Sequence, residues 1–300
     1  MRIKGIYASR PAYMQLLLLL MLLLIGIVIA SLLSAGLTLM KGTDTNLLQD
    51  PDSLRWTQLI SAICTFMLPA IALAYLCSDK VSAYLSFKKI TDEKVWGLLF
   101  LSMFLISPAV NLLGTLNEQM NLPEFMAPIE RWMRAQEDLA EELTDIMLKG
   151  EGIGVLLMNL IVIAVAAGFT EEFLFRGALQ RVVERWTSNP HIVIWIVAIL
   201  FSAFHLQFYG FIPRMLLGAY FGYLLYWGKS IWLPVFAHFM NNAYAVCIMS
   251  DSHLAQNGYL TGEVLPHQLL GYSIIAIIGL AIFIPVNQKI YHSLRCESGS

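Results

Sequence analysis

The chain has 300 residues, of which 58% are hydrophobic and only 13% are charged, with a formal net charge of −2. Soluble domains carry about 25% charged residues, so these side chains could not cover a water-facing surface of ordinary size. Because the apolar residues also come in long blocks rather than in a strand or helix alternation, the composition favours an integral membrane protein over a large soluble helical one.

Eight segments are long and apolar enough to cross a bilayer, whose hydrocarbon core of about 30 Å needs about 20 residues of helix. In chain order they are 14–40, 57–77, 95–117, 152–171, 191–209, 211–228, 231–249 and 268–288. The first is far longer than the apolar core of a signal peptide, about 7–15 residues, so we expect it to stay as an anchor. The sequence therefore predicts an all-α fold, a polytopic integral membrane helical bundle of about eight transmembrane helices.

A polar segment at 118–151 separates the third and fourth apolar blocks. It holds nine acidic residues against three basic ones, for a net charge of −6. Its stretch from about 124 to 148 has apolar residues at helical spacing, which predicts an amphipathic helix at the membrane surface. Anionic lipid would repel this charge, so we expect the helix to cap the bundle rather than to anchor it.

The distribution of Lys and Arg predicts that both termini are cytoplasmic in a multi-pass protein of the cell membrane. On that topology, twelve basic residues fall inside: Arg2, Lys4, Arg10, Lys80, Lys88, Lys89, Lys94, Arg181, Arg185, Lys229, Lys289 and Arg295. Six fall outside: Lys41, Arg55, Arg131, Arg134, Lys149 and Arg214. The acidic segment then lies outside, and we expect the functional site to open toward the inner leaflet or the cytosol.

Neither the cysteines nor the basic residues indicate a further class of partner. The four cysteines are scattered without a CxxC pair, which argues against a disulfide framework and a zinc knuckle: Cys64, Cys77, Cys247 and Cys296. No basic run interleaved with aromatic residues is present, so we expect no nucleic-acid partner.

Among the ionisable residues within or at the ends of the predicted spans of the second half of the chain, five carry the functional interpretation. They are Glu171, Glu172, Arg176, His205 and His238. Each costs at least about 2.5–3.5 kcal/mol on insertion scales, so each calls for a reason. Glu172 and Arg176 are four apart and can pair on one helix face. Glu171 is rotated about 100° away and is free to face a polar cavity as a general base.

The depth of the two hairpin arms brings His205 to Glu171. Each lies 17 residues from the turn centred near Ser188, so both are about 25 Å from it in an antiparallel hairpin. On the seventh span, His238 and Asn242 are one helical turn apart and could donate hydrogen bonds to an oxyanion. Each group alone is more often a structural ion pair or interhelical glue, whereas the three together favour a catalytic site.

These residues form three ordered motifs: Glu-Glu-x-x-x-Arg at 171–176, Phe-x-x-x-His at 201–205 and His-x-x-x-Asn at 238–242. The trio resembles the CPBP family, which comprises CAAX prenyl proteases of type II and bacteriocin-processing (Abi) proteins, over about residues 160–250. Two regions are therefore expected. Residues 1–150 lie outside the resemblance and would form N-terminal transmembrane helices plus the acidic amphipathic segment, whereas the resemblance implies that residues 151–290 form a catalytic membrane core like that of the CAAX proteases.

The family implies an intramembrane endopeptidase of the glutamate type that cleaves a membrane-associated peptide or protein without a cofactor. Glu171 would be the general base that activates a water, and His205 would hold and polarise that water. His238 and Asn242 would stabilise the oxyanion, while Glu172 and Arg176 would orient the site. Founding members remove the last three residues after a prenylated cysteine. Suggested roles of other members include bacteriocin maturation, self-immunity and scaffolding.

Three alternatives stay open on the sequence. Glu171, His205 and His238 could ligate zinc in a membrane metalloprotease, although no HExxH motif is present. The protein could be a non-catalytic membrane scaffold or bacteriocin-immunity protein, in which the motif residues are structural. Intramembrane charges also mark transport paths, although the lack of an internal repeat argues against a transporter.

Overall fold

The computed structural model describes residues 3–41, 49–262 and 264–299, and the chain is 81% helical with no strand among them. The predicted all-α class is therefore confirmed. In chain order the helices are α1 (Ala12–Lys41), α2 (Pro51–Ala62), η1 (Ile63–Met67), α3 (Leu68–Cys77), α4 (Val81–Tyr84), α5 (Glu93–Glu118), η2 (Glu124–Met126), α6 (Ala127–Leu148), α7 (Ile153–Asn159), η3 (Leu160–Ala166), α8 (Ala167–Glu172), η4 (Phe173–Leu179), α9 (Gln180–Val183), α10 (Pro190–Phe204), α11 (Phe211–Gly228), α12 (Trp232–Met249), α13 (Ser252–Ala255), α14 (Gly258–Thr261), η5 (Pro266–Gln268) and α15 (Leu269–Gly299).

The chain is a multi-pass membrane protein, but the predicted number of eight spans is not confirmed. Five helices in the described part of the chain are long and apolar enough to cross a bilayer: Ala12–Lys41, Pro51–Cys77, Glu93–Glu118, Ile153–Val183 and Pro266–Cys296. The helix predicted over 191–209 is wrong at its end, because α10 stops at Phe204. Helices α11 and α12 match their predicted positions and have 18 residues each, close to the shortest span that a bilayer accepts.

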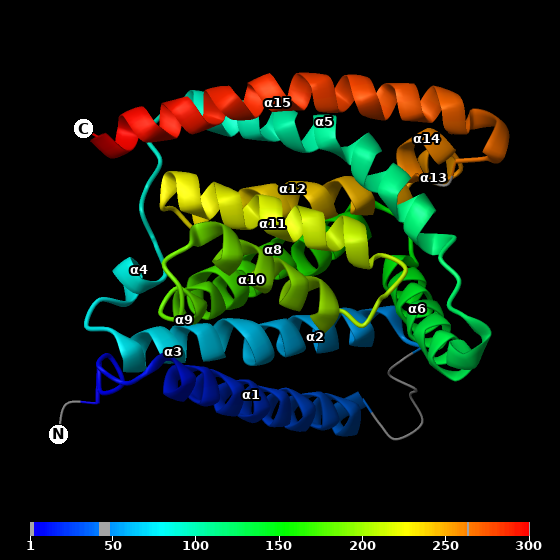
Figure 1. Ribbon diagram of the computed structural model, residues 1–300. Coiled ribbons are helices and arrows are strands. Elements are labelled where there is room, and N and C mark those ends of the chain that lie inside the picture. The colour runs from blue at the N-terminus through cyan, green and yellow to red at the C-terminus, as the bar shows by residue number, and fades with distance from the viewer. Residues whose placement is uncertain (1–2, 42–48, 263, 300) are drawn as a thin grey trace.

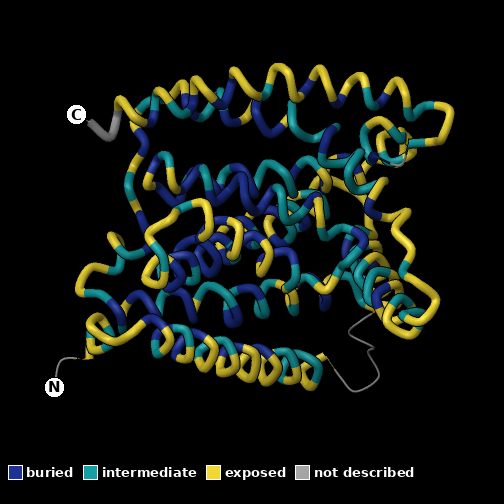
Figure 2. Tube along the Cα trace, in the orientation of Figure 1, coloured by how far each residue is buried: buried dark blue, intermediate teal, exposed yellow. Residues whose placement is uncertain are grey.

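The long helices lie roughly side by side, with α1 and α15 at opposite edges and α8, α10, α11 and α12 between them (Figure 1). The two termini lie at one end of this bundle, and α6, α13 and α14 lie at the other. Large apolar side chains cover the outer faces of α1 and α15, which Figure 2 shows as largely exposed. Exposed apolar faces of this extent are typical of helices that contact lipid.

Two apolar clusters fill the interior. One joins α1 and α3 to η4 and α10, with Leu19, Leu73, Phe173 and Val197 buried in it. The other joins α5, α11, α12 and α15 and includes Leu224. The helix from 153 to 183 is therefore supported on one side by the N-terminal helices, while α11 and α12 are supported by α5 and α15.

A buried polar triad ties α11 to α5 and α15 within the second cluster. The hydroxyls of Ser102 and Tyr220 lie 2.7 Å apart, and that of Tyr220 donates to Oδ1 of Asn287 at 2.7 Å. Nδ2 of Asn287 in turn donates to Ser102 at 2.9 Å. A satisfied network of this kind specifies one register of the three helices. It thereby positions Gly218 and Phe221, which contact the site described below.

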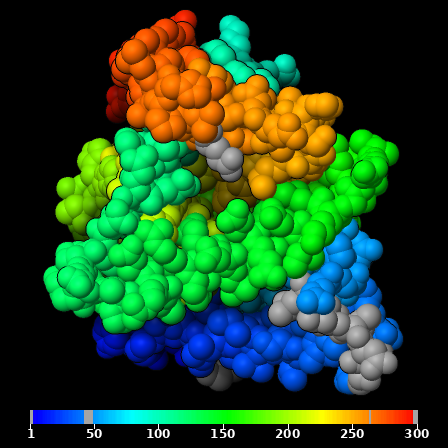
Figure 3. All heavy atoms as spheres, turned by 90° about the vertical axis from the view of Figure 1, so that its right-hand side faces the viewer, coloured from blue at the N-terminus to red at the C-terminus, as the bar shows by residue number. Residues whose placement is uncertain are grey.

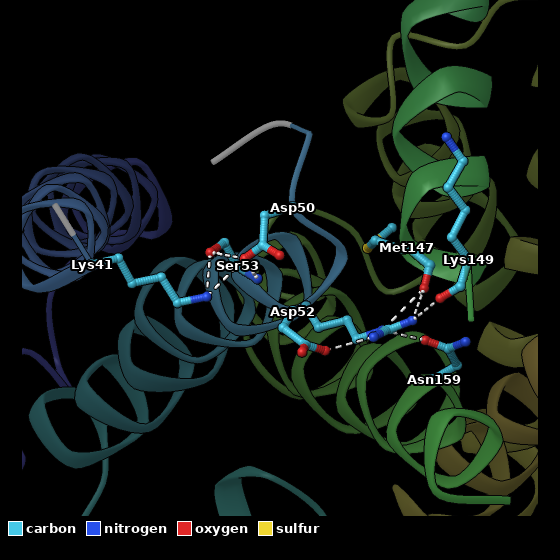
Figure 4. Close-up of polar contacts among 8 residues, drawn as sticks. Lys41, Asp50, Asp52, Ser53, Met147, Lys149 and Asn159 are labelled. Carbon is cyan, nitrogen blue, oxygen red and sulfur yellow. Dashed lines mark hydrogen bonds and ion pairs between the residues drawn. The ribbon is translucent and has the colours of Figure 1, made fainter. Parts of the chain in front are cut away.

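The predicted amphipathic helix in the acidic segment is confirmed, and a buried arginine of α2 holds its carboxyl end. Nη2 of Arg55 donates to the carbonyl oxygens of Met147 at 2.6 Å and Lys149 at 2.7 Å. Its Nε donates to Oδ1 of Asn159 at 2.8 Å, and its Nη1 pairs with Asp52 at 2.7 Å. Figure 4 shows these contacts converging where α2, α6 and α7 meet. Arg55 thus supplies donors to carbonyls that a helix end leaves unsatisfied.

A second polar contact beside it closes the start of α2 onto α1. Nζ of Lys41 donates to Oδ2 of Asp50 at 2.7 Å and to Oγ of Ser53 at 2.8 Å (Figure 4). The hydrogen bond from Lys41 is the main reason that the pKa of Asp50 falls from 3.8 to about 2. Asp50 also accepts from the backbone N–H of Ser53, which makes it the N-cap of α2.

Replacing Arg55 with leucine is expected to release the carboxyl end of α6. The carbonyls of Met147 and Lys149 would lose their donor, at about 1–3 kcal/mol for each buried acceptor left unsatisfied. Limited proteolysis of membranes should then cut near residue 149 faster than in the parent protein. Arg131→Leu, at an exposed position of α6, is the matched control. Equal cutting rates in the two variants would contradict the anchoring role.

Candidate active site

The helix that carries the first motif is interrupted by two π-helical segments. Segments η3 and η4 flank α8, which holds Glu171 and Glu172. π-helical turns are rare and frequently occur at functional sites. On the same helix, a Cβ atom at Gly168 would lie 3.2 Å from the carbonyl oxygen of Val235 and the nitrogen of Phe239. The glycine therefore allows α8 and α12 to pack backbone against backbone, which brings their motifs together.

The second motif ends a helix that is too short to cross the bilayer. Helix α10 has 15 residues, or about 22 Å of helix, against a hydrocarbon core of about 30 Å. The sequence predicted that His205 lies within a helix reaching residue 209, whereas in the structure it is the C-cap of α10. Leu206 follows with φ 56°, a left-handed conformation that costs a non-glycine residue about 1–2 kcal/mol. The chain thus bends sharply away from the helix directly after the histidine.

The loop that follows α10 is partly buried, with Leu206 46% exposed and Tyr209 4% exposed, and side chains satisfy its backbone. Asn117 of α5 donates to the carbonyl of Phe208 at 2.9 Å and accepts from the nitrogen of Ile212 at 3.0 Å. Oγ of Ser202 donates to the carbonyl of Phe211 at 2.7 Å. Non-helical backbone at membrane depth is tolerated only where it is buried in protein or lines a water-filled cavity. Burial in protein and a lining role at a water-filled cavity would both suit a site that needs water.

Helix α6 rests on the outer side of this loop. Oε2 of Glu137 accepts from the backbone nitrogen of Tyr209 at 3.2 Å. The guanidinium of Arg134 lies 4.5 Å from the centre of the Tyr209 ring, and the rings of Trp132 and Phe208 are 5.3 Å apart. This end of the molecule is hollowed between the start of α6, the region of α7 and the α13–α14 segment (Figure 3). The acidic helix therefore packs against the loop that follows His205.

The first carboxylate of the pair and both histidines converge. Oε2 of Glu171 lies 3.6 Å from Nε2 of His205 and 4.0 Å from Nε2 of His238. The side chains are 27% exposed at His205, 15% at Glu171, 6% at His238 and 0% at Glu172. Access therefore comes from the side of His205 and ends at Glu172. The shared depth of Glu171 and His205, predicted from the hairpin, agrees with these distances.

Hydrogen bonds fix which nitrogen of each imidazole faces Glu171. Nδ1 of His205 lies 2.8 Å from the carbonyl oxygen of Phe201, which can only accept, so Nδ1 carries the hydrogen. Nδ1 of His238 lies 2.8 Å from Oε1 of Glu172 and donates to that carboxylate. In each neutral ring, Nε2 is then left with a lone pair that points toward Glu171.

The second carboxylate is neutralised by the arginine of its own motif. Nη1 of Arg176 donates to Oε1 of Glu172 at 2.9 Å, and both side chains are 0% exposed. Nη2 donates to the carbonyl of Gly218 at 2.8 Å, and the guanidinium lies 4.5 Å from the centre of the Phe201 ring. A buried cation with these partners offsets the charge of Glu172 and holds its carboxylate beside His238.

The carboxamide of Asn242 has its partners outside the group around Glu171. Its Nδ2 donates to the carbonyl of Ile163 in η3 at 2.9 Å, and its Oδ1 accepts from Asn241 at 3.1 Å. The structure thus brings Glu171, His205 and His238 together, with Glu172 and Arg176 behind them. Asn242 instead joins α12 to the π-helical segment, with one amide hydrogen left over.

Three acceptor atoms in this site could bind a metal ion or a water: Oε2 of Glu171, Nε2 of His205 and Nε2 of His238. Across the described ranges, no group of three or more His, Cys, Asp and Glu side chains is arranged to hold a metal ion. A water between Glu171 and His205 could donate one hydrogen to each, and a nucleophile so held can be deprotonated by the carboxylate.

Residues 153–244 match the family model described as type II CAAX prenyl endopeptidase Rce1-like. The resemblance to CAAX proteases that the three motifs indicated is thereby confirmed over this segment, and the family is one of proteases, hence of hydrolases. All seven motif residues lie inside it.

A search of curated proteins found a partial relative. The protein named "Uncharacterized protein YpbD", from Bacillus subtilis (strain 168), is 26% identical over 103 residues, which cover 33% of this chain and 50% of that protein. The chain thus spans about half the length of this relative. No solved structure gives a significant match.

Sequence reasoning missed two groups beside the site. Asn117, within the third apolar block, holds both ends of the loop after His205. Arg214 was counted only as an outer charge, yet its guanidinium binds Gln207 of that loop. An arginine four residues into an apolar helix was the available signal, because a membrane span tolerates such a charge only for a reason.

Proposed function

We propose that this protein is an intramembrane endopeptidase that hydrolyses a peptide bond of a membrane-associated peptide or protein. One observation carries the proposal: Oε2 of Glu171 faces Nε2 of both His205 and His238. The exposed fraction of the side chains in this site falls from 27% at His205 to 0% at Glu172. A carboxylate beside two imidazoles, in a cavity of low dielectric, is suited to activate water. The match to a protease family supports the same reaction class.

In the proposed reaction, Glu171 takes a proton from a water that also donates to Nε2 of His205. The oxygen of that water attacks the carbonyl carbon, and the carbonyl oxygen becomes an oxyanion. His238 can stabilise it once it has taken up a proton from bulk water, because Nε2–H then donates to the oxyanion while Oε1 of Glu172 accepts from Nδ1–H and holds the ring in place. Glu171 returns its proton to the leaving nitrogen, which yields an acid and an amine. Asn242 would serve this step through its remaining amide hydrogen.

The substrate and the metal requirement are parts of the same proposal. The substrate would meet the site within the lipid bilayer, and whether it carries a prenyl group is open to the test below. Hydrolysis would need no cofactor. Zinc held by Glu171, His205 and His238 is the alternative chemistry on these residues. Activity that requires one zinc ion for each chain and disappears with a tight chelator would decide for zinc.

The proposal is tested by mass spectrometry of membrane peptides from cells that carry the parent protein, Glu171→Ala, or Glu141→Ala. Glu141 is an exposed acidic residue of α6, so its variant controls for loss of charge. We expect shortened peptides with the parent and Glu141→Ala, and their uncut precursors with Glu171→Ala. Identical peptides from all three strains, with all three proteins folded, would favour the scaffold alternative.

We propose further that both termini are cytoplasmic in the cell membrane, as the basic residues indicate. Because the termini and α6 lie at opposite ends of the bundle (Figure 1), the site would then open away from the cytoplasm. This cannot hold together with the expectation of an opening toward the inner leaflet or the cytosol. A fluorescent protein fused to the carboxyl end should fold and fluoresce, and alkaline phosphatase fused there should be inactive. The reverse pattern would invert the topology.

A further inference from the structure

Arg214 is a cation beside the site that the proposed chemistry does not use. It lies on the first turn of α11, and its side chain is partly buried. Nη1 donates to the carbonyl oxygen of Gln207 at 3.1 Å, and Nη2 donates to Oε1 of Gln207 at 2.8 Å. Both acceptors are neutral, so they satisfy two donors without balancing the charge.

The described residues provide no ion pair for this guanidinium. Ion pairs with carboxylates are formed instead by other cations, such as Lys41, Arg55, Arg134, Arg176 and Arg181. Within a bilayer, an arginine without a partner is expensive and marks a functional site by default. Its remaining N–H groups are arranged to bind a planar anion in two places at once.

The position of Arg214 relates this charge to the reacting groups. The two hydrogen bonds to Gln207 hold the guanidinium against the loop that begins directly after His205, two residues from that histidine. Gly210 makes the approach possible, since a Cβ atom there would lie 3.0 Å from Nη2. Arg214 therefore lies against the loop between His205 and α11, whose Tyr209 is also contacted by Glu137 of the acidic helix α6.

We propose that Arg214 binds a carboxylate of the peptide substrate and so helps to select which bond reaches Glu171. This inference rests on the proposed function, because it concerns the substrate of that site. In a peptide the anion is either the terminal carboxylate or an Asp or Glu side chain, and both offer the same two oxygens. The substrate carboxylate would replace the missing counterion of Arg214. The negative charges of Glu171 and Glu137 would repel the substrate carboxylate from other positions near the site and so keep it beside the guanidinium of Arg214.

A structural role is the competing explanation, since Arg214 also fastens the loop that carries His205. The two roles differ in what they change. Loss of a fastener lowers the turnover of every peptide alike, whereas loss of a carboxylate site lowers only the preference for carboxylates. The informative quantity is therefore a ratio of kcat/KM values and not the activity itself.

The experiment uses the full-length protein in detergent micelles and two synthetic libraries of randomised decapeptides. Both carry an N-terminal palmitoyl group, and they differ only in having a free or an amidated carboxyl end. Products are identified by mass spectrometry. The variants are Arg214→Gln and Arg214→Lys. The control is Arg134→Gln, which removes another cation near the site that is already paired with Glu130.

We expect the parent protein to prefer one carboxylate source by about 10-fold or more, the range of a charge-assisted hydrogen bond. Preference for free ends identifies the terminal carboxylate. Enrichment of Asp or Glu at one distance from the cut, in both libraries, identifies a side chain. Arg214→Gln should bring the ratio near one, Arg214→Lys should retain part of it, and Arg134→Gln should retain all of it.

Two results would overturn the inference while leaving the peptidase intact. One is cleavage by the parent protein with no preference for either carboxylate. The other is an unchanged ratio in Arg214→Gln, whatever its activity, which would assign the residue to the loop alone. If the parent cleaves neither library and the membrane peptides do not depend on Glu171, the proposed function fails and takes this inference with it.

Discussion

Purified protein carrying Glu171→Gln is expected to lose at least about 1,000-fold in kcat, within the range by which general-base catalysis accelerates reactions. Glutamine keeps the size and the polarity of the side chain but cannot accept a proton from water. Because Oε2 of Glu171 lies 3.6 and 4.0 Å from its nearest partners, it contributes no short ion pair to the fold. The thermal unfolding midpoint should therefore stay close to that of the parent.

The comparison with His205→Ala shows whether the two groups share one water. If they do, the double variant should be little slower than Glu171→Gln alone, since groups that act as a unit are not additive. A Glu171→Gln protein that is folded and retains a tenth of the parent's kcat would exclude a role as the base.

Replacing Glu172 with glutamine is expected to reduce stability and activity together. The change leaves Arg176 without its counterion at a site where both side chains are 0% exposed, and breaking a buried pair from one side costs about 3–5 kcal/mol. His238 also loses the carboxylate that accepts from its Nδ1. Chemical denaturation in micelles measures the first effect, and kcat measures the second.

The double variant Glu172→Gln, Arg176→Met separates the two effects. Removing both charges eliminates the unpaired cation, so much of the lost stability should return. Activity should not return, because the imidazolium of His238 would still lack its anionic partner. Recovery of both properties would mean that Glu172 acts only as the counterion of Arg176 and has no part in orienting His238.

Helix positions and the pairing of charged residues could be predicted from the sequence because they depend on local periodicity. Glu172 and Arg176 stay in contact four residues apart even where the helix becomes π-helical. The common depth of Glu171 and His205 followed from counting residues on either side of one turn. Both arguments use only the rise and the twist of a helix, which sequence spacing determines.

Features that depend on contacts between distant segments could not be predicted in this way. The end of α10 at Phe204 depends on Asn117, Ser202 and Glu137 satisfying the loop, and the apolar pattern continues past that end. The π-helical segments carry no signal in spacing alone. Asn242 shares a helix with His238, but which neighbour its amide meets depends on how closely α12 approaches η3.

The loop between α10 and α11 constrains how proteins of this kind can diverge. Side chains from four helices form hydrogen bonds with the backbone in and around this loop, and Leu206 adopts a strained left-handed conformation within it. An insertion or deletion of one residue would shift the imidazole of His205 relative to Glu171. It would also move Arg214 away from its hydrogen-bond partner Gln207. This short bend therefore has to keep its number of residues as such proteins diverge.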